Sequence, residues 1–146
     1  MPLSVEIIDG KTTRARGLKS VTEAAVNLVG VISGESPAEP SSFSIRGFSR
    51  SSVVILRDGI YLGPTSMTMR PQNTFNLERV EILKGPNALH QNIGASGGAI
   101  NMVTKKPVIG QQNSTEFFMS SGRFDSSELG LGIGGSSSNT SAYRVD

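Results

Sequence analysis

Residues 75–107 read FNLERVEILKGPNALHQNIGASGGAINMVTKKP, and this stretch decides the fold. It opens with a predicted strand, Leu77 to Lys84, that carries four charged side chains among apolar ones. A Gly-Pro break, a short helical or loop stretch and a glycine-rich turn follow. An apolar strand, Ala99 to Thr104, closes the unit before Lys105-Lys106-Pro107. Apart from one histidine the stretch holds no catalytic group, so it indicates a gate or a binding module and not an enzyme.

The composition limits the architecture and the kinds of site. A chain of 146 residues suffices for one modest domain. A hydrophobic content of 36% with 17 glycines suits turns and short strands more than a helix bundle. The net charge of +2 is too weak to argue for a nucleic-acid partner. The absence of cysteine excludes disulfides, thiolate metal sites and cysteine catalysis.

The sequence shows no targeting or spanning segment. No stretch approaches the about 18 apolar residues of a membrane-spanning helix. The first residues lack the basic start and apolar centre of a secretory signal, so we expect the chain to be cytoplasmic or to have lost its natural start. It stops at Asp146 within a predicted strand, which indicates a fragment.

Local patterns predict short elements before the deciding stretch. Leu3, Val5 and Ile7 alternate with polar residues and predict a strand that Asp9-Gly10 ends. The polar stretch 11–20 is expected to hold a short helix, and a second helix should run from its N-cap Thr22 to Asn27. The remaining expectations are a loop at 34–42, a strand at 43–48, strands at 53–56 and 60–62 around a tight turn or bulge at Asp58-Gly59, and a long polar loop at 63–76.

From Ser114 the pattern changes to apolar and polar residues in alternation. Leu129, Leu131 and Ile133 share one parity with Ser127, and small or polar residues occupy the other. Such strands are typical of membrane barrels, with lipid on one side and the lumen on the other. An amphipathic sheet in a soluble protein has the same pattern, so this feature alone leaves both open.

Several segments together resemble the plug domain of TonB-dependent outer-membrane receptors, most closely those for ferric siderophores. The matching stretches are Ser44-Ile-Arg-Gly-Phe48, Asp58-Gly-Ile-Tyr-Leu-Gly63, Asn76 to Pro86, and Gly94 to Pro107. The family usually has Tyr-Gly where this chain has His90-Gln91. The resemblance implies an α+β fold, in which a small mixed-sheet plug with short helices sits inside a barrel of about 22 strands.

The resemblance also implies domain boundaries and a function. Residues 1–107 would be the plug, 108–113 a linker, and 114–146 the first two to three antiparallel strands of an incomplete transmembrane β-barrel. The plug would gate the lumen and help to bind a ferric siderophore or similar chelate. TonB would pull on it from the periplasmic side of the Gram-negative outer membrane, so no cofactor is expected. The alternative is a free-standing soluble ligand-binding module from a truncated receptor with no transport role.

Two groups of site residues follow from the resemblance. The first is a ligand-binding apex, made of Arg46, Ser49, Arg50, Ser51, Tyr61, Met67, Met69 and Arg70. The second is a latch between plug and barrel on the charged strand, made of Glu78, Arg79, Glu81 and Lys84. Since buried charges must be paired, these four would pair with opposite charges on barrel strands outside the chain.

Other motifs favour structural readings. Gly130 to Gly135 fits the dinucleotide pattern G-x-G-x-x-G, but neither the helix nor the acid that this chemistry needs follows. Gly94 to Gly98 lacks the Gly-Lys-Ser/Thr of a phosphate loop. His90 has no partner that the sequence specifies for catalysis or metal binding. We therefore predict no catalytic and no metal-ligating residue.

Overall fold

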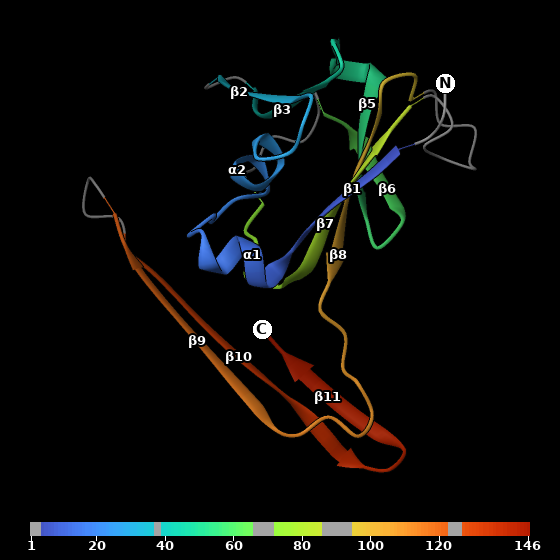
Figure 1. Ribbon diagram of the computed structural model, residues 1–146. Helices are drawn as coiled ribbons and strands as arrows, with labels where there is room; N and C mark the ends of the chain where they lie inside the picture. Colours follow the sequence, from blue (N-terminus) through green and yellow to red (C-terminus); the bar gives the residue numbers. More distant parts are fainter. Residues whose placement is uncertain (1–3, 37–38, 66–71, 86–94, 123–126) are drawn as a thin grey trace. The chain divides into compact units, whose positions relative to one another are not determined.

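The computed structural model describes residues 4–36, 39–65, 72–85, 95–122 and 127–146. The chain divides into two compact units, Met1–Thr104 and Lys105–Asp146. The first unit consists of strands and short helices (Figure 1): β1 (Ser4–Asp9), α1 (Gly10–Ala15), α2 (Val21–Val26), β2 (Val31–Ser36), β3 (Glu39–Ile45), β4 (Phe48–Ser49), a 3-10 turn (Arg50–Ser52), β5 (Val53–Arg57), β6 (Ile60–Pro64), β7 (Leu77–Lys84) and β8 (Gly98–Thr104).

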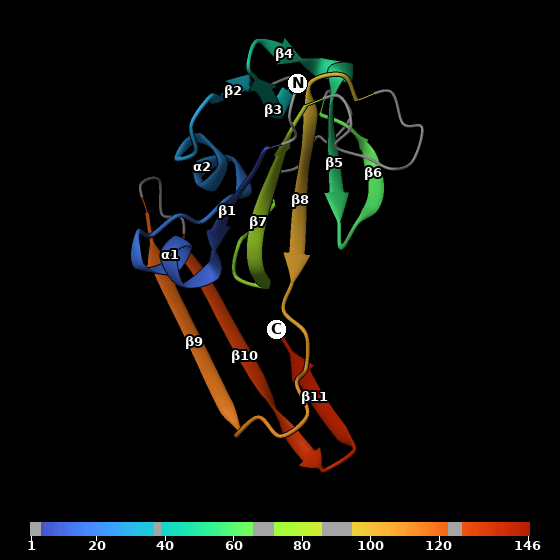
Figure 2. The same cartoon turned by 45° about the vertical axis from the view of Figure 1, so that its right-hand side comes forward.

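The main sheet of the first unit has the strand order β1-β7-β8-β5-β6 (Figure 2). Its strands pair antiparallel except β5 and β8, which are parallel. The mixed sheet with few short helices confirms the predicted α+β class. Strand β7 has the predicted bounds, and β8 begins one residue before the predicted strand. In β5 the residues Val53 to Leu56 are buried on both faces, as expected for an inner strand with a continuous apolar run.

One face of the main sheet carries the larger part of the core. Ile82, Ile100 and Met102 on this face are almost fully buried. They pack in one cluster with Ala24 and Ala25 of α2 and with apolar residues of β2 and β3. The opposite face has a smaller cluster around Val54, Leu56, Ala95 and Ala99. The fold of this unit is therefore held by burial on both sides of β5 and β8.

The expected N-cap of α2 is wrong. Ser20 and not Thr22 caps the helix, in a reciprocal pair: the Glu23 backbone N–H donates to the Ser20 hydroxyl (3.1 Å), and the Glu23 carboxylate accepts from the Ser20 N–H (3.3 Å). Thr22 lies inside the helix and is buried. The spacing Ser-x-x-Glu at 20–23 is the capping-box signature and could have located this end.

The segment expected as a loop at 34–42 contributes to an antiparallel hairpin of β2 and β3. Val31, Phe43 and Ile45 of this hairpin are buried in the larger core. Burial of these side chains outweighs the weak strand preference of the Ser-, Gly- and Pro-rich stretch between them. The strand expected at 43–48 is in fact two strands, because Arg46 and Gly47 have positive φ angles of 51° and 85° and turn the chain into β4.

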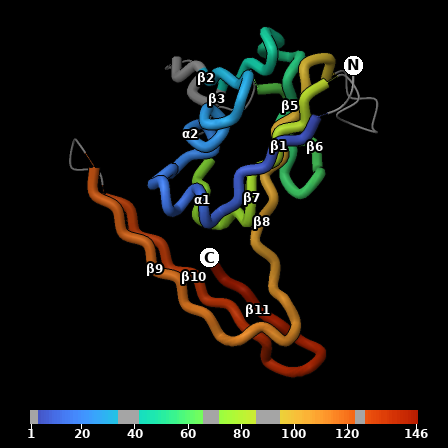
Figure 3. Tube along the Cα trace, viewed as in Figure 1, coloured from blue at the N-terminus to red at the C-terminus, as the bar shows by residue number. Residues whose placement is uncertain are grey.

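The second unit is a three-stranded antiparallel sheet of order β11-β10-β9 (Figure 3). Its strands are β9 (Ser114–Ser121), β10 (Ser127–Ser138) and β11 (Ser141–Val145). Alternate residues along each strand are exposed, and the exposed set is mostly apolar on one face: Phe117, Met119, Leu129, Leu131, Ile133, Tyr143 and Val145. The additional antiparallel strands were predicted, while the boundaries at 107 and 114 stay a prediction.

No helix within the described ranges is long and apolar enough to cross a lipid bilayer.

Candidate functional site

The two ends of the main sheet carry different polar groups. We call the end where Ser4, Lys84, Gly98 and Val53 lie in register the Gly98 end. We call the end at Asp9, Arg79 and Thr104, together with the β5–β6 turn, the Thr104 end. The predicted site residues divide between these two ends.

Arg46 lies at the Gly98 end, in the turn between β3 and β4. Its guanidinium donates to the Ser4 hydroxyl (3.1 Å), and its backbone N–H donates to the Gly30 carbonyl (3.0 Å). The side chain is exposed despite this contact. A fixed but accessible cation is suited to an anionic group on a ligand.

Ser49, Arg50 and Ser51 lie beside Val53 at the same end and are exposed. Arg50 has a positive φ of 55°, and its carbonyl accepts from the Thr65 hydroxyl (2.9 Å). This bond fixes the 3-10 turn against the end of β6 and leaves the guanidinium at the surface. The structure thus brings four of the predicted apex residues to one end of the sheet.

Tyr61 is separated from this group. It pairs with Leu56 in the β5–β6 hairpin, close to the turn of the Thr104 end. Pro64, at the other end of β6, lies three positions further along the strand, a length of about 10 Å. Tyr61 as a whole residue is 40% exposed. Met67, Met69 and Arg70, the other predicted apex residues, lie outside the described residues, as does His90.

Three of the predicted latch residues form a polar group on β7 near the Thr104 end. The Arg79 Nε donates to Glu81 (2.7 Å), and its Nη1 donates to Glu78 (3.2 Å). The hydrogen bond to Glu81 and the two neighbouring carboxylates raise the pKa of Arg79 above its ordinary value. The side chain of Arg79 is 35% exposed, so this pairing occurs at a partly solvated surface.

Lys84, the fourth latch residue, is in a different environment. Its side chain is only 3% exposed and pairs with Glu6 of β1 at 2.6 Å. It also donates to the Val29 carbonyl. The charge of Lys84 is therefore compensated inside the first unit, without any further strand. Glu6 was not predicted as a site residue, and nothing in its local sequence marks it.

The polar group on β7 continues across β8 to the β5–β6 turn. The Asn101 amide donates to Glu81 (2.9 Å) and its carbonyl oxygen accepts from the Gly59 N–H (3.0 Å). Asp58 accepts from the Thr104 N–H (3.0 Å) and from the Thr104 hydroxyl (2.7 Å). Asp58 and Gly59 have φ angles of 51° and 81°, the geometry of a two-residue type I′ turn. The β5–β6 turn is therefore hydrogen-bonded to Thr104, the last residue of β8.

We expect Asp58→Ala to destabilise the chain by about 1–3 kcal/mol, because it removes both bonds to Thr104 and places alanine at a positive φ. Asp58→Asn keeps an oxygen acceptor and a residue that tolerates this φ, so its cost should be less than half as large. Urea unfolding of the 146-residue chain measures both. Equal costs for the two variants would show that the hydrogen bonds from Asp58 to Thr104 do not contribute to the stability of the chain.

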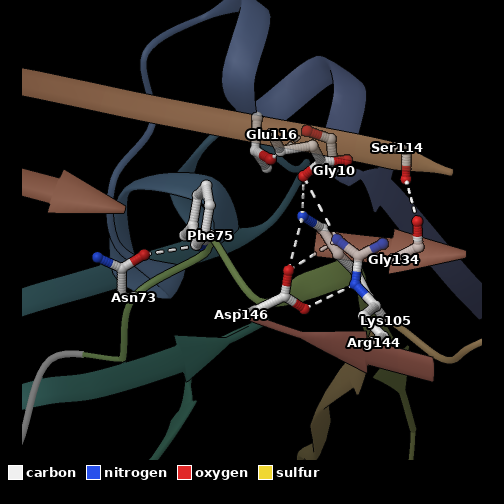
Figure 4. A network of polar contacts seen from close by, with 10 residues as sticks. Gly10, Asn73, Phe75, Lys105, Ser114, Glu116, Gly134, Arg144 and Asp146 are labelled. Atoms are coloured by element: carbon white, nitrogen blue, oxygen red, sulfur yellow. Dashed lines mark hydrogen bonds and ion pairs between the residues drawn. The ribbon is translucent and has the colours of Figure 1, made fainter. Parts of the chain in front are cut away.

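The second unit contains a compact ion cluster that sequence analysis missed (Figure 4). Arg144 pairs with Asp146 (2.7 Å) and with Glu116 (3.4 Å), and Lys105 pairs with Glu116. The Arg144 and Asp146 side chains are each 10% exposed. Two cations and two acids balance each other here, so the cluster ties the first residue of the unit to β9 and β11. Arg144 and Asp146 are two residues apart, but Lys105 and Glu116 lie 11 residues from each other and 28 to 41 residues from that pair, so no local pattern relates the four.

Among the described residues, no group of three or more His, Cys, Asp or Glu side chains could hold a metal ion.

The comparisons with known proteins identify the family. Residues 1–99 match the model of the TonB-dependent receptor plug domain. This chain belongs to that family. It is 31% identical over 110 residues to the probable TonB-dependent receptor BfrD of Bordetella pertussis, a match that covers 73% of this chain and 14% of that protein.

Two further relatives are named as receptors for a siderophore and for hemin. The catecholate siderophore receptor Fiu of Escherichia coli K12 is 31% identical over 110 residues, covering 71% of this chain and 14% of Fiu. The hemin receptor of Yersinia enterocolitica is 31% identical over 108 residues, covering 70% of this chain and 15% of the receptor. These relatives are named as receptors. The chain spans only about a seventh of the length of each relative.

Solved structures show the same fold. The open form of the ferric-catecholate import receptor Fiu from E. coli K12 aligns with a TM-score of 0.78 and 26% identity, covering 99% of this chain and 20% of Fiu. The pyoverdine outer membrane receptor FpvA from Pseudomonas aeruginosa PAO1 aligns with a TM-score of 0.76 and 22% identity, covering 92% of this chain and 20% of FpvA. The described fold is thus that of a plug domain with its following strands.

Proposed function

We propose that this chain is the plug, with adjoining barrel strands, of an outer-membrane TonB-dependent transporter for ferric siderophores. The observation that carries the proposal is the plug-family match over residues 1–99, joined to relatives named for a siderophore and for hemin. One relative, from Vibrio cholerae, is named an iron-regulated outer membrane virulence protein, which supports this location. The plug would close the lumen and open when TonB pulls on it, so transport would need no catalytic residue.

The strands of the second unit support a barrel role for residues 114–146, with 108–113 as the linker. Phe117, Leu129 and Leu131 are each more than half exposed on the same face of the sheet. An apolar face of this kind suits contact with lipid, and glycine and charged residues on the other face suit contact with a plug or a lumen. We propose the boundaries 1–107, 108–113 and 114–146 on this basis.

For the ligand we propose the Gly98 end as the binding surface. Arg46 and Arg50 present two cations there, and the nearby serine hydroxyls add donors and acceptors. Arg70 and the two methionines remain part of the proposal from sequence alone. Tyr61 lies near the Thr104 end, so it would contact the ligand only if the ligand extended to that end of the sheet.

The complete receptor that contains this chain should take up ferric siderophore in iron-limited cells when TonB is present and not when it is absent. Uptake of radiolabelled iron, supplied as a ferric catecholate or as hemin, measures this and separates the two cargo classes. Tight binding of the chelate by the 146-residue chain alone, with no uptake by the complete receptor, would favour the soluble ligand-binding module instead.

In the complete receptor, Arg46→Gln should weaken binding of an anionic ferric chelate about tenfold, the effect of losing one charge-assisted contact. Arg16→Gln removes the same charge from the segment after α1 and is the control, because Arg16 is exposed next to that helix and not at the Gly98 end. Fluorescence titration with the chelate measures both variants. Equal affinities in Arg46→Gln and Arg16→Gln would remove Arg46 from the site.

A further inference from the structure

Val29 is held by its backbone and not by its side chain. It lies between α2 and β2, and the residue is 79% exposed. Its N–H donates to the Glu6 carboxylate (3.1 Å), and its carbonyl accepts from the Lys84 ammonium. Glu6 and Lys84 pair with each other at 2.6 Å. Two charged side chains from neighbouring strands therefore bind the backbone N–H and the backbone carbonyl of Val29.

This arrangement depends on Glu6. Lys84 is 3% exposed, and a buried ammonium is costly unless a carboxylate and further acceptors compensate it. Glu6 is the one acid that pairs with Lys84 among the described residues. With Glu6 removed, the ammonium would keep only the Val29 carbonyl, and the Val29 N–H would lose its acceptor.

Glu6 lies on an edge strand of the main sheet. Strand β1 is at the edge and pairs only with β7. Ser4 of the same strand accepts from the Arg46 guanidinium, and the Arg46 N–H is bonded to Gly30, the residue after Val29. Strand β1 thus contacts the segment from Val29 to Arg46 at both of its ends.

We propose that Glu6 is a positioning residue that couples β1 to the hairpin carrying Arg46. When β1 leaves the sheet, Lys84 loses its carboxylate, Val29 is released, and the turn at Arg46 loses its contact with Ser4. Displacement of β1 would then always be accompanied by loosening of the Gly98 end around Arg46. Its meaning for transport rests on the proposed function, since it would link movement of the N-terminal strand to release of the chelate.

Amide hydrogen exchange on the 146-residue chain tests the coupling. In Glu6→Ala, the Val29 and Arg46 amides should exchange at least about tenfold faster relative to Ile100, an inner-strand reporter of global unfolding. In Glu6→Gln, which keeps an oxygen acceptor, the change should be smaller. Ile7→Ala is the control: it alters the next residue of β1, which is 56% exposed, and should leave the ratio of the Val29 and Ile100 exchange rates unchanged.

Lys84→Met adds an independent test by a double-mutant cycle, because methionine retains an apolar side chain without the charge. The effect of Glu6→Ala on the unfolding equilibrium constant should be at least about fivefold smaller in the Lys84→Met background. Two results would overturn the proposal. The first is an unchanged exchange rate of the Val29 amide in Glu6→Ala. The second is a double variant whose change in unfolding equilibrium constant equals the product of the changes in Glu6→Ala and Lys84→Met.

The outcome does not depend on the transport role. Exchange is measured without a chelate, so a complete receptor that fails to take up iron would refute the proposed function and leave the coupling intact. A receptor that transports iron while Glu6→Ala shows no selective change at Val29 would refute the coupling alone.

Discussion

Replacement of Gly98 by alanine is expected to destabilise the first unit by about 4 kcal/mol or more. Gly98 begins β8 and has φ of 140°, a conformation that side-chain-bearing residues rarely adopt. A Cβ atom added there would lie 2.3 Å from the carbonyl oxygen of Leu83 on β7. The clash is with the backbone of β7, and β8 is the central strand, paired with β7 on one side and β5 on the other, so its backbone cannot move away without breaking these pairings.

Gly85 provides the matched control for Gly98. Its φ of 130° is similar, but no atom of the described residues, its chain neighbours aside, lies within 4 Å of an added Cβ. Gly85→Ala should therefore show the conformational cost alone, about 1–2 kcal/mol. Urea denaturation of the 146-residue chain gives both free energies of unfolding. A Gly98→Ala cost no larger than that of Gly85→Ala would mean that the sheet does not hold β7 and β8 at the described separation.

Arg79→Ala is expected to cost about 3–5 kcal/mol in the complete receptor, if barrel strands cover β7 and exclude water from its charged group. In the 146-residue chain the same substitution should cost only about 1 kcal/mol, because the Arg79 side chain is 35% exposed and its pairs with Glu78 and Glu81 are partly solvated. The difference between the two costs measures what the proposed latch contributes.

Arg16→Ala is the charge-matched control for Arg79→Ala. Arg16→Ala removes an exposed arginine after α1 and should cost the same small amount in both proteins. Denaturant unfolding of the 146-residue chain and of the complete receptor in detergent gives the four values. Equal costs of Arg79→Ala in the two proteins would show that Arg79 acts only within the plug, through Glu81 and its neighbour Asn101.

The sequence by itself determined the features that short-range patterns encode. The charged strand from Leu77 to Lys84 and the apolar strand after the glycine turn have the predicted positions, because alternation and turn residues fix both. The Asp58-Gly59 turn was predicted for the same reason, since few residues accept two consecutive positive φ angles. The motif set also determined the family and the α+β class.

Only the tertiary structure decided the partners of the charged residues. Lys84 and Glu6 are 78 residues apart in the sequence, and their pairing follows from the register of β1 on β7. The separation of Tyr61 from Arg46 follows in the same way from the direction of the β5–β6 hairpin. The strands at 31–36 and 39–45 form because Val31, Phe43 and Ile45 reach a core built by distant strands. Local secondary-structure propensity does not depend on residues that are distant in the sequence. The free energy of long-range burial and charge pairing therefore decided these strands and ion pairs.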